Sequence, residues 1–312
     1  MNIALIFPGQ GSQYVGMGQD FFENSEVSKS VFLSLDEITK SNLSELIFSG
    51  SEETLALTTN SQPAIMSVSI AIYRFLENKG YLNHNLIRCV AGHSLGEYSA
   101  LVVNRSISYE DSVKLLMARS IAMQECMPVG TGGMAAVIGQ SETQITNIID
   151  NLKKIGRLFI ANDNADGQIV LSGDMKAIDY LVSNSKLLDV RRAIKLPVSA
   201  PFHCELIQSA AKTFENKLND FNFLDFKYPF YSNVTAKKEN SGNIKNLLSQ
   251  QIVNKVRWRE TIENMNKEHI DLFIEIGPGK VLTNLIKRSS KNVEAVSISK
   301  MSDLDILEKY IK

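Results

Sequence analysis

The chain of 312 residues has only three cysteines and four histidines, and it carries almost no net charge. The cysteines, Cys89, Cys126 and Cys204, are odd in number and far apart. This argues against a disulfide framework and favours a reducing, cytoplasmic compartment. None of them has metal-ligand spacing to a histidine, so we expect no metal site. The formal net charge of −1 provides no global field that would attract nucleic acid or an anionic membrane, and we expect neither as a partner.

Long apolar segments and targeting signals are also lacking. No hydrophobic run reaches the length of a membrane span. Residues 1–9 have no basic region ahead of their short apolar run, so we expect no signal peptide. Hydrophobic residues make up 44% of the chain and charged residues 21%, as in an ordinary globular protein. The length allows one large domain, or a domain with an insertion.

Two glycine-containing turns fail as nucleotide sites. Gly9-Gln10-Gly11 follows a predicted strand but lacks the third glycine of a dinucleotide fingerprint. Gly277-Pro278-Gly279-Lys280 is followed by Val281 where a phosphate loop needs Ser or Thr. We therefore expect no cofactor.

Strand and helix patterns alternate along most of the chain, which favours an α/β architecture around a mainly parallel sheet. The predicted strands are residues 3–7, 87–91, 272–276 and 293–296, and the predicted helices are residues 64–76, 109–127, 205–218, 246–253, 281–288 and 303–310.

The middle of the chain has a different order. Strands are predicted at 134–138, 158–161, 168–171 and 189–196, and helices at 142–152 and 176–184. This β-α-β-β-α-β order is the ferredoxin-like pattern. We therefore predict a large α/β-hydrolase-like domain formed by residues 1–128 and 198–312. A small ferredoxin-like domain, residues 129–197, is inserted into it, with a cleft between the two.

The pentapeptide Gly92-His93-Ser94-Leu95-Gly96 lies between a predicted strand and a helical pattern. Glycines on both sides of a serine at such a turn are typical of a nucleophile elbow, which exposes the hydroxyl at the edge of a sheet. The pattern alone is weak. A strand-to-helix turn that merely needs small residues is the alternative.

A serine nucleophile needs a base, and His203 is the favoured candidate. It follows an apolar, proline-bounded loop at the proposed domain junction, although it could simply begin a helix. His93 should diverge from its neighbour Ser94, while His84 and His269 lie in polar stretches typical of the surface. No acid partner stands out, and Glu97 should point away from His203. A backbone carbonyl can fix the imidazole tautomer instead, so a Ser–His dyad suffices.

Several motifs occur in a fixed order along nearly the whole chain. They are Phe7-Pro8-Gly9-Gln10-Gly11-Ser12-Gln13, Gln62-Pro63-Ala64, Gly92 to Tyr98, Gly130 to Ala136, Asn162 with Gly167-Gln168-Ile169-Val170, Leu196 to His203, Gln251 through Val256-Arg257-Trp258, and Glu275 to Lys280. With these motifs the chain resembles the malonyl-CoA:acyl carrier protein transacylases, the acyltransferases of fatty acid synthesis.

The resemblance implies a role for each matching residue. Ser94 is expected to carry the malonyl ester, with His203 as its base. Gln10 and the backbone N–H of Leu95 are expected to form the oxyanion hole, and the backbone carbonyl of Gln251 to orient His203.

The substrate-binding residues implied by the resemblance are Arg119, His93, Phe202 and Asn162. Arg119 is expected to bind the substrate carboxylate, and a guanidinium can do so through two hydrogen bonds. It interrupts an apolar helix face, where a solvated arginine is the alternative. His93 would line the site, and the ring of Phe202 would crowd an α-methyl group. One departure is Ser120, where the family commonly has Gly.

The partners implied are malonyl-CoA and an acidic, phosphopantetheinylated acyl carrier protein. Arg191, Arg192 and Lys195 form a candidate docking surface, with Lys287 and Arg288 as a second one. Solvated surface charges are the alternative for both sets.

Two other functions stay open at this point. A serine hydrolase would share the elbow, would use His269 as a late base and would not need Arg119. A non-catalytic carrier-binding scaffold would need none of Ser94, His203 and Gln10.

Overall fold

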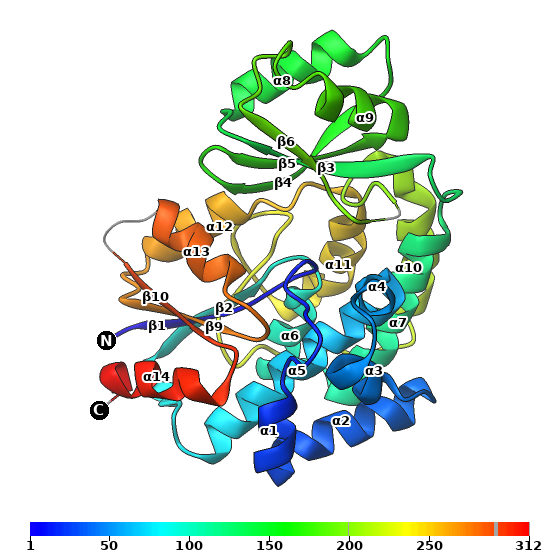
Figure 1. Ribbon diagram of the computed structural model, residues 1–312. Coiled ribbons are helices and arrows are strands. Elements are labelled where there is room, and N and C mark those ends of the chain that lie inside the picture. The colour runs from blue at the N-terminus through cyan, green and yellow to red at the C-terminus, as the bar shows by residue number, and fades with distance from the viewer. Residues whose placement is uncertain (199, 290–292, 312) are drawn as a thin grey trace.

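The computed structural model describes residues 1–198, 200–289 and 293–311. Two sheets, each packed with helices, make up the molecule, and the smaller sheet lies above the larger one in the view of Figure 1. None of the helices in the described ranges has an apolar stretch long enough to cross a membrane.

The larger sheet is mainly parallel, as predicted. Its order is β10-β9-β1-β2-β7-β8, and only the β7–β8 pair is antiparallel. Its strands are β1 (Ile3–Phe7), β2 (Ile87–Gly92), β7 (Phe230–Tyr231), β8 (Lys238–Glu239), β9 (Leu272–Ile276) and β10 (Glu294–Ile298). Strands β1 and β9 are buried at every residue, which is why they are nearly continuous apolar runs. The carboxyl ends of the parallel strands share one edge, where α/β proteins place their sites.

Helices cover both faces of this sheet. The longest, α5, is buried along most of its length, and α2 and α7 pack against it. The helices are α1 (Gln19–Asn24), α2 (Glu26–Thr39), α3 (Leu43–Ser49), α4 (Glu52–Ala56), α5 (Thr58–Asn78), α6 (Gly96–Val103), α7 (Tyr109–Glu125), α10 (Gln208–Leu218), α11 (Ile244–Val253), α12 (Trp258–Asn266), α13 (Val281–Ser289) and α14 (Leu304–Ile311). Short 3₁₀ helices are η1 (His84–Leu86), η2 (Glu205–Ile207), η3 (Ser241–Asn243) and η4 (Met301–Asp303).

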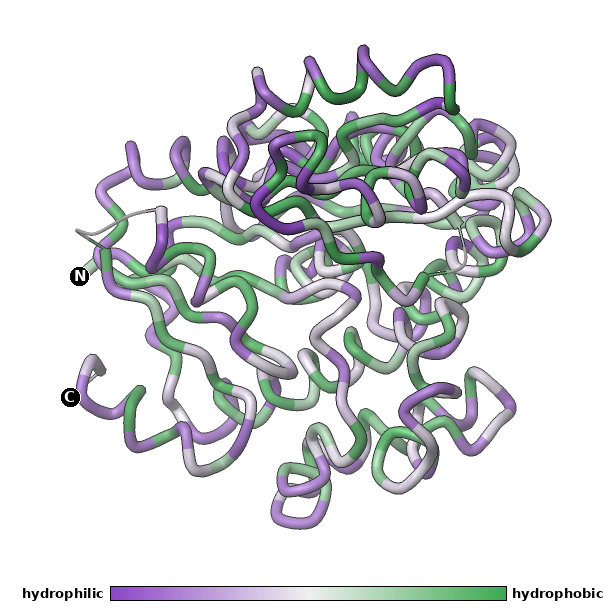
Figure 2. The backbone as a smooth tube through the Cα atoms, turned by 45° about the horizontal axis from the view of Figure 1, so that its top comes forward, coloured by the Kyte–Doolittle hydropathy of each residue, from purple (hydrophilic) through white to green (hydrophobic). Residues whose placement is uncertain are grey.

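The smaller sheet is antiparallel, in the order β4-β5-β3-β6. Its elements are β3 (Gly132–Ile138), α8 (Glu142–Leu152), β4 (Leu158–Ala165), β5 (Gln168–Asp174), α9 (Met175–Ser183) and β6 (Arg192–Lys195). Both helices are amphipathic and bury isoleucines and leucines against the sheet. In Figure 2 the helix at the top of the view alternates between hydrophobic and hydrophilic residues.

Backbone hydrogen bonds tie the smaller sheet to the segment that joins α11 and α12. The N–H of Asp163 in β4 donates to the carbonyl of Val256, and the N–H of Val256 donates to the carbonyl of Ala161. The Asp163 carboxylate also pairs with Arg259 of α12 at 2.8 Å. These contacts hold β4 against α12 and the segment that leads into it.

Several predicted boundaries differ from the structure. Helix α5 begins six residues before the predicted Ala64, because the N–H groups of Asn60 and Ser61 already donate to the carbonyl of Leu57. The strand predicted at 189–196 shortens to β6, since Asp189 has a positive φ of 53° and the chain is still turning there. The helix predicted at 205–218 is divided into η2 and α10. Helices α1 to α4 and α12, and strands β7 and β8, were not predicted.

Candidate active site

Backbone sterics explain the glycines that flank Ser94. A Cβ on Gly92 would lie 1.9 Å from the carbonyl carbon of Gly96, and one on Gly96 would lie 2.3 Å from the carbonyl oxygen of Phe7. Ser94 itself has a φ of 52°, in the left-handed region that non-glycine residues rarely adopt. The turn between β2 and α6 is therefore a strained elbow of the kind that presents a nucleophile.

Ser94 and His203 meet at this elbow. The Ser94 Oγ lies 2.8 Å from His203 Nε2, and His203 Nδ1 lies 2.8 Å from the backbone carbonyl oxygen of Gln251. Because that carbonyl can only accept, Nδ1 carries the proton and Nε2 is free to accept the hydroxyl proton. Burial, together with the positive charge of Arg119, lowers the pKa of His203 to about 3. The imidazole is therefore an unprotonated base at neutral pH.

Arg119 is fully buried beside this pair, on α7. Its Nη2 donates to Ser94 Oγ at 3.1 Å and to Gln251 Oε1 at 2.8 Å, and its Nη1 donates to Gln62 Oε1 at 2.7 Å. All three acceptors are neutral. The guanidinium stays charged despite burial, which lowers its pKa, so the site holds a cation with no carboxylate bonded to it.

The backbone around Ser94 offers a donor for an oxyanion. The Ser94 N–H is taken, since it donates to Asn233 Oδ1 at 2.7 Å. The Leu95 N–H has no acceptor among the residues that the structure describes. Gln10 follows β1 at the same sheet edge, and its Nε2 makes only a long 3.5 Å contact with Thr58 Oγ1. Both groups are thus available to a ligand.

Glu97 lies buried beneath the elbow and does not contact His203 through any described hydrogen bond. Its carboxyl oxygens accept from the backbone N–H of Asn233 and, at 2.6 Å, from the side-chain amide of Gln251. Burial raises the pKa of Glu97 to about 8, against the opposing effect of these donors and of Arg119.

A buried nucleophile, an unprotonated base and an unpaired guanidinium meet at this edge, and the sequence matches the acyl transferase domain over residues 4–312. The chain belongs to the acyl transferase domain family. It is 38% identical to a malonyl CoA-acyl carrier protein transacylase of Bacillus subtilis, over 99% of this chain and 97% of the relative.

Solved structures agree with this assignment. An acyl-carrier-protein S-malonyltransferase from Bartonella henselae superposes with a TM-score of 0.95 at 41% identity, covering 100% of this chain and 99% of that one. A malonyl-transacylase solved in complex with a type II PKS acyl-carrier protein gives a TM-score of 0.94 at 33% identity, with coverages of 99% and 100%.

In this acyl transferase His93 points away from the dyad, as expected. Its Nε2 lies 2.8 Å from Asn164 Oδ1, and its ring packs edge-on against Trp258. Asn162, two residues before Asn164 in β4, is buried and forms an isolated β-bridge with Val256. Asn164 and Trp258 therefore support the elbow, a role for which the local sequence carries no signal.

The loop that carries His203 is held from both sides. The carbonyl of Phe202 accepts from the hydroxyl of Ser172 in the smaller sheet, and the N–H of His203 donates to the carbonyl of Ile252 in α11. Phe202 is buried next to the base. His203 has a φ of 60°, so the base, like the nucleophile, sits on strained backbone.

The other two histidines lie at the opposite edge of the larger sheet. His269 precedes β9, and its carbonyl accepts from Asn2, which precedes β1. His84 precedes β2 and contacts Tyr228. A strand of five residues spans about 17 Å, so neither ring reaches Ser94. This removes the hydrolase arrangement in which His269 is the base.

A cavity opens next to Gln10. It encloses about 560 Å³ and has mainly apolar walls. Its lining is Glu53, Ala56, Leu57, Thr58, Lys195, Leu196, Pro197 and Val198. Thr58, on the wall of this cavity, is the residue whose hydroxyl Gln10 contacts at 3.5 Å.

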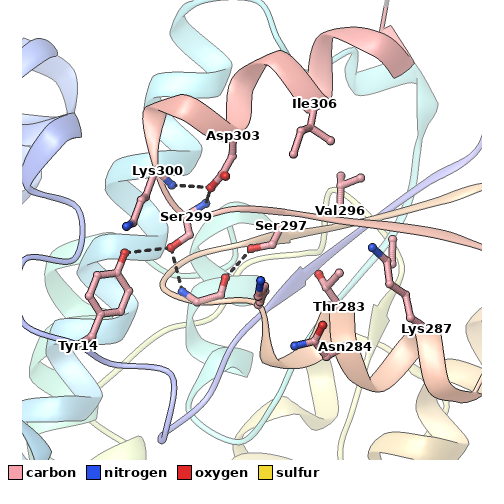
Figure 3. Close-up of a pocket in the computed structure, with 13 residues that line it drawn as sticks. Tyr14, Thr283, Asn284, Lys287, Val296, Ser297, Ser299, Lys300, Asp303 and Ile306 are labelled. Atoms are coloured by element: carbon pink, nitrogen blue, oxygen red, sulfur yellow. Dashed lines mark hydrogen bonds between the residues drawn. The ribbon is translucent and has the colours of Figure 1, made fainter.

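A second groove, of about 660 Å³, lies between α13, β10 and α14 (Figure 3). Lys280, Lys287 and Lys300 line it, and none of them forms a salt bridge with a described residue. Asp303 is its one acidic group and is occupied by the backbone N–H groups of Ser299 and Lys300.

The two predicted docking surfaces differ in their pairing. In the first, Arg191 and Arg192 are exposed, whereas Lys195 pairs with Asp179 at 2.7 Å. In the second, Lys287 forms no salt bridge with any residue in the described ranges, and Arg288 reaches Gln168 of the smaller sheet at 3.0 Å. No group of three His, Cys, Asp or Glu side chains that could hold a metal occurs within 1–198, 200–289 and 293–311.

Proposed function

We propose that the protein transfers the malonyl group of malonyl-CoA to the phosphopantetheine thiol of an acyl carrier protein, supplying fatty acid synthesis. The observation that carries this proposal is the buried Arg119 guanidinium, 3.1 Å from the Ser94 hydroxyl and bonded only to neutral acceptors. A permanent positive charge beside the nucleophile fits an acyl group that ends in a carboxylate. A neutral acyl group would leave this charge uncompensated.

In the first half-reaction His203 Nε2 takes the Ser94 proton as Oγ attacks the thioester carbonyl carbon. The Leu95 N–H and the Gln10 side chain stabilise the resulting oxyanion. The C–S bond then breaks, and His203 returns the proton to the departing CoA sulfur. The Gln251 carbonyl holds the imidazole in one tautomer throughout, in the place of an acid.

The second half-reaction repeats these steps with the carrier thiol. His203 takes the thiol proton, the sulfur attacks the Ser94 ester, and the Ser94 oxygen regains the proton as the C–O bond breaks. Water must be kept from the ester for transfer to win over hydrolysis. The apolar cavity beside Gln10 suits the pantetheine arm, and filling it would exclude water from that side.

Arg119 would aim the acyl group by binding its carboxylate. His93 and Asn162 are assigned supporting positions in the acyl site, and Phe202 would crowd an α-methyl branch.

We also propose the division into an α/β-hydrolase-like domain, residues 1–128 and 198–312, and a ferredoxin-like domain, residues 129–197. The β-α-β-β-α-β chain order and the strand order β4-β5-β3-β6 support the second assignment.

Intact-mass measurement tests this function. The protein mixed with malonyl-CoA should gain the mass of one malonyl group, and the Ser94→Ala variant should gain nothing. Addition of a phosphopantetheinylated carrier protein should move the group to the carrier. If no adduct forms in the parent protein, a non-catalytic scaffold becomes the better account.

For carrier docking we propose the surface of Arg191, Arg192 and Lys195, with Lys287 and Arg288 as the second candidate. The position of Lys287 on the lysine-lined groove supports the second set, and the exposed arginines support the first. Reversing charge at Arg191 and Arg192, or at Lys287 and Arg288, should raise the KM for the carrier protein and leave Ser94 acylation unchanged. The set whose reversal leaves that KM unchanged is not the docking surface.

A further inference from the structure

The buried carboxyl of Glu97 has no part in the reaction steps above, yet it contacts Gln251, the residue at the centre of the site. Glu97 is fully buried on α6, three residues after the nucleophile. One of its oxygens accepts from the Asn233 backbone N–H and the other from Gln251 Nε2 at 2.6 Å. These two neighbours are N–H donors, and a hydrogen bond from the Ser232 side chain also lowers the pKa of Glu97, an arrangement that suits an ionised carboxylate.

These contacts decide which way the Gln251 amide faces. Its NH₂ group donates to Glu97 and, at 3.0 Å, to the Ser94 carbonyl. Its oxygen is consequently turned toward Arg119 Nη2, at 2.8 Å. A reversed amide would place an NH₂ group against the guanidinium, where two donors would oppose each other.

Arg119 in turn depends on this acceptor for its position. Of its three described hydrogen bonds, the one to Gln62 holds Nη1, and those to Ser94 and Gln251 hold Nη2. The hydroxyl of Ser94 becomes an ester oxygen during the reaction, so Gln251 is the partner that keeps Nη2 in place in the acyl-enzyme.

We propose that Glu97 is a positioning residue for acyl selection: its carboxylate fixes the Gln251 amide, which holds the Arg119 guanidinium where it binds the acyl carboxylate. This proposal rests on the proposed malonyl transfer. It concerns the choice of acyl group and leaves the Ser94–His203 chemistry untouched.

The test compares Glu97→Gln with the parent, using malonyl-CoA and acetyl-CoA as donors at pH 9. The amide of Glu97→Gln has one oxygen and one NH₂ group, so its NH₂ group must face either the Asn233 N–H or the Gln251 NH₂ group, both of which are donors. The Gln251 amide is then free to turn over and present its NH₂ group to Arg119. We expect the kcat/KM for malonyl-CoA to fall about 10- to 100-fold, the effect of losing a hydrogen bond to a charged group. The loss should lie mainly in KM, and acylation by acetyl-CoA should be unchanged.

A further measurement separates positioning from mere support of the fold. Glu275→Gln is the matched control, because Glu275 is equally buried but accepts from Leu282 and Thr283 at the start of α13. It should leave the malonyl-to-acetyl ratio unchanged.

The pH profile provides an independent readout. Burial raises the pKa of Glu97 to about 8, so its ionised fraction increases between pH 7 and 9. The charged and titratable groups that act on it are Arg119 from α7 and Tyr98 on its own helix. The malonyl-to-acetyl ratio should increase over this range in the parent and stay flat in Glu97→Gln.

Several results would overturn the proposal: an equal loss with both donors, an unchanged ratio in Glu97→Gln, or the same loss of ratio in Glu275→Gln. If Glu97→Gln does not fold, Glu97→Asp replaces it, since one fewer methylene withdraws the carboxylate from Gln251, and the same loss of ratio is expected. A parent protein that forms no malonyl adduct refutes the proposed function instead, a result that is seen before any Glu97 variant is made.

Discussion

Replacing Arg119 by methionine is the sharpest perturbation that the site offers. The side chain is fully buried, so alanine would leave a cavity next to Tyr98 and mix a packing defect with the loss of charge. Methionine has a similar length and fills irregular space. Arg119→Met therefore removes three hydrogen bonds and one positive charge while keeping most of the volume.

The size of the effect follows from the environment of the guanidinium. Removing one partner of a buried ion pair costs about 3–5 kcal/mol, because the other charge is left without compensation. Applied to the acyl carboxylate, this is roughly a 100- to 5,000-fold loss in kcat/KM for malonyl-CoA. Acetyl-CoA has no carboxylate, so in the parent protein an acetyl group leaves the Arg119 cation without a negative partner. Arg119→Met has no such cation, and acylation of its Ser94 by acetyl-CoA should therefore be unchanged or faster.

The assay is single-turnover acylation followed by intact mass, with the two donors in parallel. Arg119→Lys is the matched control: it keeps the charge but loses the planar two-bond fork, so its malonyl preference should lie between those of the parent and Arg119→Met. Thermal unfolding of each variant checks that the fold is retained. A folded Arg119→Met protein with the malonyl-to-acetyl ratio of the parent would refute the role of Arg119.

Four more outcomes are expected. Because the pKa of His203 is lowered to about 3, acylation by acetyl-CoA should stay constant from pH 8 down to 5, and a fall centred near pH 6.5 would contradict this. The unfolded chain binds the His203 proton more tightly, so this residue should destabilise the fold increasingly as pH falls below 6.5, and denaturant unfolding of His203→Gln beside the parent measures the difference. Gly92→Ala should abolish acylation, since its Cβ would lie 1.9 Å from the Gly96 carbonyl carbon; an active, normally folded variant would show that the elbow can relax. Glu275→Gln should lower the unfolding free energy by about 1–3 kcal/mol, because an amide can accept only one of the two N–H bonds that the carboxylate now accepts, and an unchanged midpoint would argue against this capping role.

Features that depend only on residues close together in the sequence could be predicted from it. Strands β1, β2 and β9 were found because they are almost wholly buried and their apolar runs are interrupted by at most one charged residue. The elbow was recognised because only glycine fits where the Gly92 and Gly96 backbones come into contact. Helices α1, α3 and α4 were missed because each has seven residues or fewer. Helix α2, with 14 residues, was missed although it is amphipathic, since most of its residues are polar.

Contacts between distant segments were beyond the sequence alone. The nucleophile could be inferred locally, but its partner had to be chosen among four histidines. The structure decides the choice: His203, 109 residues later, bonds Ser94, whereas His84 and His269 lie at the opposite edge of the larger sheet. The contacts of Gln62, Asn233 and Glu97 around Ser94 carry no local signal, because an amide or carboxyl is recognised only by the donors and acceptors that packing brings to it.

The sequence by itself determined the α/β class, the mainly parallel sheet and a serine on a glycine-flanked turn, because hydrophobic period and backbone sterics act over a few residues. Only the tertiary structure decided which base that serine meets and that Arg119 is a buried cation bonded to neutral acceptors. Burial and charge compensation are properties of the whole packed molecule, and they are what make this serine selective.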